Sequence, residues 1–153
     1  MRARIMHTAS FTRTASALVL ALGIAGPCAA QSAPTPGAFY EQLGGKMGVA
    51  AIVADFVQIM LADKRVNGTF EGVDLERLRS KLGEQFCVAS GGPCSYTGKS
   101  MAESHEDMKV SNAQFNAAVE NLQLAMEHQG VPSRIQNRLL GKLASTQREI
   151  VTK

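Results

Sequence analysis

Apolar residues recur at steps of three and four along most of the chain, and this spacing is what most constrains the fold. From residue 39 to residue 150 it matches one face of a helix in segment after segment, and no stretch shows the sustained alternation of a half-buried strand. Glycine pairs at 44–45 and 91–92, and the segment Gly130-Val131-Pro132, interrupt the pattern. The sequence therefore predicts an all-α domain built from short helices.

Helix start and stop signals divide this part of the chain into elements. Ser100 with Glu103, and Ser111 with Gln114, form two capping boxes, in which side chains satisfy backbone N–H groups at a helix start. Each glycine pair falls at a corner between helices, where positive φ or close backbone approach is expected. The expected elements are a short helix at 39–43, a long helix from about 49 to 63, an irregular corner at 66–73, a helix from the N-cap Asp74 to about 90, a short helix and a longer one after the two capping boxes, and a last helix reaching about 150.

The first thirty residues differ from the rest of the chain. Arginines precede an apolar run at 17–26, which is much shorter than the roughly 20 residues that cross a bilayer, and small residues follow. This pattern predicts a signal peptide at 1–30, a flexible lead-in at 31–38 and one folded domain at 39–153. We therefore expect an exported protein, located in the bacterial periplasm. A lipoprotein signal at Cys28 is the alternative, although Pro27 stands where a small residue is usual.

Loss of this leader changes the charge balance. The whole chain has 16 basic and 13 acidic residues, and Arg2, Arg4 and Arg13 would leave with the signal peptide, so 13 basic residues would face 13 acidic ones. No basic stripe then remains to favour nucleic acid or an anionic membrane. We expect no nucleic-acid partner and no stable membrane association after cleavage.

Cys87 and Cys94 are the two cysteines of the expected mature domain. Export would place them where disulfides persist, and a bridge between them would close a loop worth roughly 2.5 kcal/mol by the chain-entropy estimate. The alternative is a pair of buried free thiols. A bridge would also restrain the loop that leads to His105.

His105 is the side chain best suited to hold a cofactor. The first capping box starts a helix that places Met101, His105 and Met108 on one face. A lone imidazole among methionines and apolar faces suits the axial ligand of a haem iron. The alternative is a core histidine satisfied by a backbone carbonyl. The other mature histidine, His128, lies among polar residues near a helix end and should be exposed to solvent.

Motifs in a fixed order make the chain resemble the group I truncated haemoglobins. They are Tyr40-Glu41-Gln42-Leu43-Gly44-Gly45, Asp55-Phe56, Leu61-Ala62-Asp63, Phe70, Gly91-Gly92-Pro93, Tyr96-Thr97-Gly98, Met101 with His105, and Gly130-Val131-Pro132. The resemblance covers residues 40 to about 150 and implies a two-over-two helical sandwich around haem b, with His105 as the proximal iron ligand.

The expected haem contacts combine this resemblance with the apolar stripes of the predicted helices. Phe70 resembles the globin phenylalanine that stacks on the porphyrin, while Tyr96 and Lys99 are candidate propionate contacts. The alternative is that apolar residues at helical spacing simply form core. The full set of candidate contacts is Phe70, Leu78, Leu82, Phe86, Tyr96, Lys99, Met101, Met108, Val110 and Phe115.

The predicted distal wall departs from the family pattern. By the resemblance, Val57 stands where many members have a tyrosine, and Leu78 and Leu82 occupy the two other facing positions. A hydrogen-bond donor to bound O2 is worth on the order of 1.5–3 kcal/mol. Its absence should therefore speed O2 release about ten- to a hundredfold and affect CO much less.

Three polar residues could alter this expectation. Gln58 follows Val57, and Gln85 lies on the stripe of Leu82, so either could supply a donor. Lys81 could ligate iron as a neutral amine, but a surface lysine is the simpler alternative because burial of the amine must overcome its high pKa.

These residues predict a binding protein that reversibly holds O2, CO or NO at a haem iron ligated by His105. The alternative is a haem enzyme that detoxifies NO or peroxide, as an NO dioxygenase or peroxidase would, with electrons from a reductase. An apolar distal wall disfavours that chemistry, which benefits from a polar group near the iron. A haem-free helical module that binds a protein partner is the third alternative, and it would be colourless.

Overall fold

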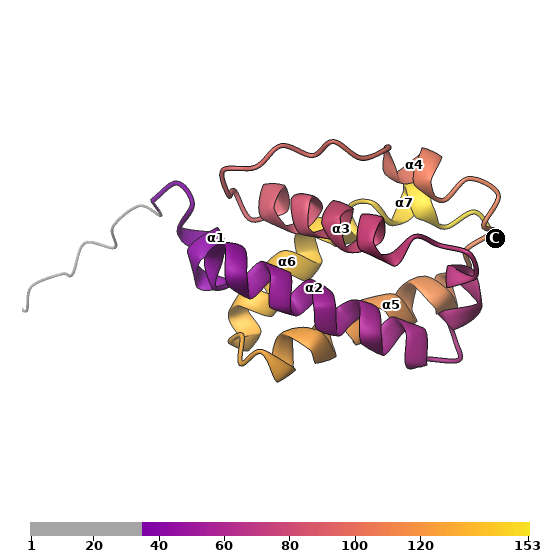
Figure 1. Ribbon diagram of the computed structural model, residues 1–153, viewed down its shortest axis with the longest axis horizontal. Coiled ribbons are helices and arrows are strands. Elements are labelled where there is room, and N and C mark those ends of the chain that lie inside the picture. Colours follow the sequence, from indigo (N-terminus) through magenta and orange to yellow (C-terminus); the bar gives the residue numbers. More distant parts are fainter. Residues whose placement is uncertain (1–34) are drawn as a thin grey trace, which may run out of the picture. The chain divides into compact units, whose positions relative to one another are not determined.

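The computed structural model describes residues 35–153, so the predicted signal peptide lies outside the described residues. Within them the chain forms helices and no β-strand, as predicted (Figure 1). The elements are α1 (Ala38–Gln42), α2 (Gly45–Ala62), the 3-10 helix η1 (Asn67–Phe70), α3 (Leu75–Ala89), α4 (Met101–Ser104), α5 (Asn112–His128), α6 (Ser133–Ala144) and α7 (Gln147–Ile150).

Helix α2 forms the centre of the core, with α3 packed on one side and α5 on the other (Figure 1). It is long and apolar enough to pass for a membrane span, but its apolar face is the buried face of the domain. Ile52 and Val57 are almost fully buried, and the Phe56 ring lies 6.2 Å from the Phe86 ring of α3. Burial of an apolar stripe against two neighbouring helices stabilises this arrangement.

The glycine pairs lie at the corners that the sequence predicts. Gly44 has a φ of 87° at the start of α2, and Gly91 has a φ of 77° after α3. An added Cβ on Gly92 would lie 2.6 Å from the Cys87 sulfur and 2.7 Å from the Tyr40 ring. A larger residue at position 92 would therefore push α1 away from the end of α3.

The short helix after Ser100 ends one turn earlier than its apolar face suggested. It stops at Ser104, so His105 is the C-cap residue, and Met108 belongs to the following turn. Asp107 and Lys109 have φ values of 62° and 51° in that turn. Left-handed backbone at these positions cannot continue a right-handed helix, and it redirects the chain toward α5.

The single last helix that the sequence predicts is divided into α6 and α7. Ser145 and Thr146 separate them, and their hydroxyls donate hydrogen bonds to the carbonyl oxygens of Lys142 and Leu143, at 2.8 and 2.7 Å. Such local hydrogen bonds compete with the continuation of a helix. The break lets α7 turn toward α4, where the chain ends beside Val110 in a bridge to Val151.

Candidate functional site

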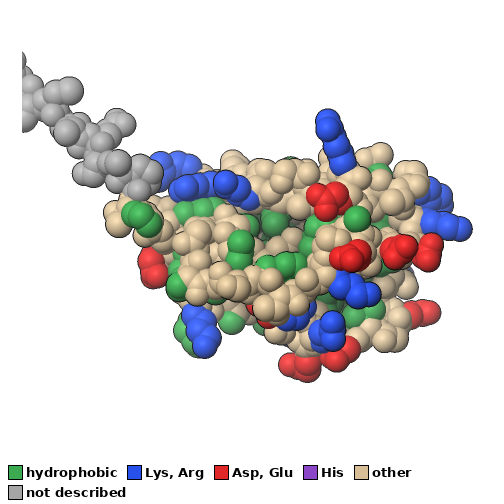
Figure 2. Space-filling model, turned by 90° about the horizontal axis from the view of Figure 1, so that it is seen from above, with side chains coloured by type: hydrophobic (Ala, Val, Ile, Leu, Met, Phe, Trp, Pro, Cys, Tyr) green, Lys and Arg blue, Asp and Glu red, His purple; other side chains and the backbone are tan. Residues whose placement is uncertain are grey.

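A cavity of about 320 Å³ lies between the helices and is walled mainly by apolar side chains. Figure 2 shows hydrophobic side chains gathered along the middle of one face, with charged side chains around them. Cavities of this size and polarity are typical of cofactor sites. The lining residues are Phe56, Val57, Met60, Val66, Thr69, Phe70, Val73, Leu78, Leu82, Gln85, Phe86, Met101, Ser104, His105, Met108, Val110, Gln114, Phe115, Ala118, Val119, Leu122, Leu140, Leu143, Thr146 and Ile150.

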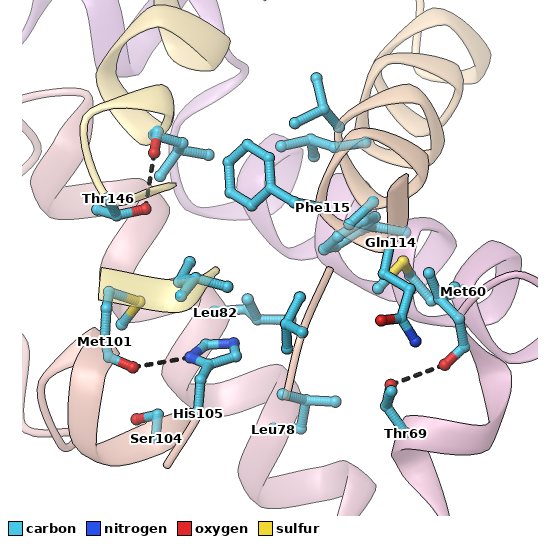
Figure 3. Close-up of a pocket in the computed structure, with 18 of the residues that line it drawn as sticks. Met60, Thr69, Leu78, Leu82, Met101, Ser104, His105, Gln114, Phe115 and Thr146 are labelled. Carbon is cyan, nitrogen blue, oxygen red and sulfur yellow. Dashed lines mark hydrogen bonds between the residues drawn. The ribbon is translucent and has the colours of Figure 1, made fainter. Parts of the chain in front are cut away.

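His105 enters this cavity with one ring nitrogen already engaged. Its Nδ1 lies 2.8 Å from the carbonyl oxygen of Met101, one turn earlier in the chain. A carbonyl only accepts, so Nδ1 carries a hydrogen, and in the neutral imidazole Nε2 then keeps its lone pair. In Figure 3 this second nitrogen is turned away from Met101 and into the cavity. The site thus presents one neutral imidazole donor at a fixed orientation, which is the arrangement that holds a metal-ligating histidine.

The capping box predicted at Ser100 holds the short helix that carries this carbonyl. The Ser100 hydroxyl accepts from the Glu103 N–H at 3.2 Å, and the Glu103 carboxylate accepts from the Ser100 N–H at 2.9 Å. The Ser100 hydroxyl also donates to the Glu103 carboxylate at 2.7 Å, and this hydrogen bond, with that from the Ser100 N–H, holds the pKa of Glu103 below its usual value. A four-residue helix has too few internal hydrogen bonds to persist alone, so the cap is part of what positions His105.

The three residues predicted to form the distal wall all line the cavity. Val57 is buried on α2, and Leu78 and Leu82 project from successive turns of α3 (Figure 3). None of them carries a hydrogen-bond donor. The predicted contacts Phe70, Phe86, Met101, Met108, Val110 and Phe115 line the same cavity.

Polar lining residues are mostly engaged with the protein itself. The Thr69 and Thr146 hydroxyls donate to the carbonyl oxygens of Val66 and Leu143, each at 2.7 Å. The Gln85 amide lies 3.3 Å from the Met101 sulfur, so the structure brings this predicted donor into the lining but holds it against α4.

Gln114 is a lining residue that sequence reasoning missed. Its side-chain oxygen accepts from the Ser111 N–H at 3.0 Å in the second capping box, and the amide nitrogen faces the cavity on the side of Thr69 (Figure 3). The capping box accounted for Gln114 in the sequence, so a second role of its side chain in the cavity was not considered. Leu140 was also missed, because the division of the last helix determines which of its residues face inward.

Four predicted site residues lie outside the lining. Gln58 is exposed on the outer side of α2, so its interpretation as a distal donor is wrong. The hydroxyl of Tyr96 donates to the carbonyl oxygen of Lys99 at 2.7 Å, and Lys99 itself is exposed, so neither side chain reaches the cavity wall. Helix and loop geometry, which spacing alone does not reveal, turns these side chains outward.

Lys81 also lies outside the lining, because it is held on the outer side of α3. Its Nζ donates to Glu84 at 2.7 Å and to the Thr97 hydroxyl at 2.5 Å. The Lys81 hydrogen bond, together with those from Thr97, lowers the pKa of Glu84 to about 2. The amine is thus a charged partner of a carboxylate here, and not a ligand directed at the cavity.

Cys87 at the end of α3 is joined to Cys94 by a disulfide, with the two Cα atoms 6.0 Å apart. The bridge anchors the loop that leads from α3 to α4. His128, at the end of α5, is exposed as expected and contacts the Asp55 carboxylate at 2.8 Å.

A helical sandwich that surrounds one apolar slot, with a single free imidazole nitrogen in its wall, defines the class of the globins. Residues 38–152 match the family of bacterial-like globins, and the chain belongs to this family. It is therefore a haem-binding globin that binds diatomic ligands.

The chain is similar to group 1 truncated hemoglobins over most of their length. It is 33% identical to the GlbN protein of Mycolicibacterium paratuberculosis over 117 residues, which are 76% of this chain and 86% of that protein. It is 31% identical to the Tetrahymena pyriformis protein, with coverage of 77% and 98%.

Solved structures show the same fold. The Fe(III) form of the Tetrahymena pyriformis truncated hemoglobin superimposes with a TM-score of 0.73 at 31% identity, over 75% of this chain and 98% of that one. The Synechococcus 2/2 hemoglobin, in the cyanomet state with covalently attached heme, gives a TM-score of 0.69 at 27% identity, with coverage of 75% and 98%. The predicted two-over-two architecture is confirmed.

Proposed function

We propose that His105 supplies the nitrogen that ligates the iron of haem b in this globin, and that O2, CO or NO binds reversibly on the opposite side of the cavity. The observation that carries this proposal is the hydrogen bond from Nδ1 to Met101, which leaves Nε2 free and directed into the slot (Figure 3). The haem, when bound, would supply the iron that holds the gas.

The other lining residues would enclose the cofactor and limit its contact with water. Phe70 on η1 and Phe115 on α5 provide aromatic surface, and Met101 and Met108 flank the histidine. Val110, which follows the turn after His105, is buried and lines the cavity. Exclusion of water from such a slot favours neutral ligands over charged ones and protects ferrous iron from oxidation.

The distal wall would set the preference among gases. Val57, Leu78 and Leu82 offer no donor, so a ligand that gains negative charge on binding receives no hydrogen bond from them. O2 gains more charge than CO does, and its release should be about ten- to a hundredfold faster than from a pocket with such a donor. We therefore propose a globin that releases O2 rapidly and retains CO.

Absorption spectra of the purified protein with hemin test this proposal. Ferric, ferrous and ferrous-CO spectra should show a haem bound through imidazole. The substitution His105→Gly should remove that signature, and free imidazole should restore it by occupying the vacated space. Spectra that do not change after this substitution would exclude His105 as the ligand.

We further propose that a reductase keeps the iron ferrous, because gas binding of this kind depends on the reduced state. Enzymatic detoxification of NO or peroxide is the alternative, and the apolar distal wall argues against it. Measurement of NO consumption by the ferrous protein in the presence of O2 and a reductant separates the two functions.

We propose export to the periplasm, with residues 1–30 as the signal peptide and no stable membrane association afterwards. The basic front, the short apolar run and the small residues before Gln31 support this proposal. The Cys87–Cys94 disulfide supports it too, because disulfides persist in oxidising compartments. Mass spectrometry of the secreted form should find an N-terminus at Gln31, whereas a lipid-modified Cys28 would establish the lipoprotein alternative.

A further inference from the structure

One loop joins α3, which carries part of the distal wall, to α4, which orients His105. Two contacts hold this loop against α3. Helix α3 carries Leu78 and Leu82, and α4 carries the carbonyl that orients His105. Residues 90–100 connect them. The Cys87–Cys94 disulfide is the first tie, and it leaves the six residues before α4 unanchored by any covalent bond.

The second tie joins Glu84 of α3 to Thr97, which lies three residues beyond Cys94 in the loop. The Oε2 atom of Glu84 accepts from the backbone N–H of Thr97 at 2.8 Å and from the Thr97 hydroxyl at 2.9 Å. Its other oxygen, Oε1, accepts from Lys81 at 2.7 Å. The Glu84 and Lys81 side chains retain 24% and 27% of their exposure, so this cluster is partly shielded from water. Three charge-assisted hydrogen bonds on one carboxylate form a well-defined anchor.

The segment between Thr97 and His105 has little conformational freedom. Tyr96 folds its ring over Gly98 and donates from its hydroxyl to the Lys99 carbonyl at 2.7 Å, which closes the loop into a tight turn. Ser100 follows directly as the cap of α4. The Met101 carbonyl comes next and holds Nδ1 of His105. A displacement of Thr97 would therefore be passed to the imidazole with few flexible bonds between them.

We propose that Glu84 is a positioning residue for His105, which acts by holding Thr97 against α3 and so sets the separation between the distal wall and the iron ligand. This inference rests on the proposed role of His105. It assigns a role to a residue that is not among those that line the cavity. Outer partners that orient a metal-ligating histidine typically change metal affinity ten- to a hundredfold when removed.

The Glu84 carboxylate also accepts a hydrogen bond from the Lys81 amine, so the substitution Glu84→Ala alone would have two effects. Glu84→Ala would free the amine, which could then enter the cavity and mask the effect on His105. The test therefore compares Lys81→Ala with the double variant Lys81→Ala, Glu84→Ala, in which no amine is released. Glu76→Ala in the Lys81→Ala background is the matched control, because Glu76 forms a similar pair with Arg79 on the same helix and does not contact the loop.

Two measurements on the haem-loaded ferrous protein report the position of the histidine. The resonance Raman band of the iron–imidazole stretch reports the orientation of the ligand, and the rate of haem transfer to apomyoglobin reports retention. We expect the Glu84 variant to show a shifted or broadened band and haem loss about tenfold faster than the Lys81→Ala reference. The Glu76 control should match the reference in both. In the Lys81→Ala background, Glu84→Gln, which keeps an oxygen acceptor for Thr97, should recover most of the band of the Lys81→Ala reference.

An unchanged band and unchanged haem loss in the Glu84 variant would overturn the proposal and would mean that the disulfide suffices to hold the loop. Equal changes in the Glu76 control would also overturn it, because they would reflect general loss of stability in α3. A wild-type protein without an iron–imidazole band would instead refute the proposed role of His105.

Discussion

The Nδ1 atom of His105 lies 2.8 Å from the carbonyl oxygen of Met101, in a helix of only four residues. The orientation of the imidazole therefore depends on whether that short helix persists. Ser100→Ala removes the hydroxyl that caps it, and we expect a loss of about 1 kcal/mol in unfolding free energy together with faster haem loss. Urea unfolding and haem transfer to apomyoglobin measure the two effects.

Ser111→Ala is the matched control for this substitution, because Ser111 caps α5 with the same pattern of hydrogen bonds. Helix α5 has 17 residues packed against α2, so it should keep its position after the loss of its cap. A similar loss of stability with a much smaller change in haem retention is expected. Equal haem loss in both variants would show that the cap of α4 has no special part in holding the histidine.

A donor introduced into the distal wall should slow O2 release. Leu78→Gln places an amide on α3 at nearly constant volume, and we expect O2 dissociation to slow about ten- to a hundredfold, with CO dissociation changed only a few-fold. Stopped-flow and flash photolysis give both rates. Leu78→Met, which has a similar size but no donor, should release O2 at nearly the wild-type rate. If wild-type O2 dissociation is already slow, a donor such as Gln85 or Gln114 must reach the bound gas.

The backbone at Lys109 is expected to be a site of local strain, with a φ of 51°. Lys109→Gly should raise the free energy of unfolding by about 0.5–1 kcal/mol, because glycine adopts positive φ at little cost. Gly91→Ala tests the converse, since Gly91 has a φ of 77° and open space around it, and should lower stability by about 1 kcal/mol. Urea unfolding measures the stability of both variants. A Lys109→Gly protein no more stable than wild type would show that the backbone at Lys109 is not strained.

The disulfide should contribute about 2.5 kcal/mol to the stability of the folded domain by restricting the unfolded chain. Reduction of the wild-type protein should therefore lower the urea midpoint. The double variant Cys87→Ala, Cys94→Ala should show a low midpoint that a reductant does not change. A midpoint that is insensitive to reductant in the wild type would show that the bridge adds nothing.

The Glu84 anchor should make stability depend on pH at the acidic end. Hydrogen bonds from Lys81 and Thr97 lower the pKa of this carboxyl from 4.5 to about 2 in the folded protein. A depressed folded pKa contributes stability above the unfolded pKa, and this contribution is lost as the pH falls from about 5 toward 2. Glu84→Gln should therefore lose less stability than wild type over this range, as measured by thermal unfolding. Parallel plots of stability against pH for the two proteins would show that Glu84 does not contribute in this way.

The helical elements could be predicted from local patterns in the chain, and the arrangement of the site from the motifs that resemble the truncated haemoglobins. Apolar steps of three and four identify α2, α3 and α5, and the two capping boxes mark the starts of α4 and α5. Val57, Leu78 and Leu82 were assigned to one wall, and all three line the cavity with His105. The helix assignments depend on residues within a few turns of one another, whereas the three wall residues were assigned through the resemblance to the truncated haemoglobins.

The outward rotation of Gln58, the Lys81–Glu84–Thr97 cluster and the break between α6 and α7 were not predictable in this way. They depend on which surfaces remain free once helices distant in the sequence have packed.

The sequence by itself determined that the domain is helical, where α3, α4 and α5 begin, and which imidazole could serve as a ligand, because hydrophobic period and capping act over short distances. Only the tertiary structure decided that Glu84 and Lys81 hold the loop before α4 through Thr97. Those contacts exist because packing brings separate segments within hydrogen-bond reach, and no local pattern encodes that distance.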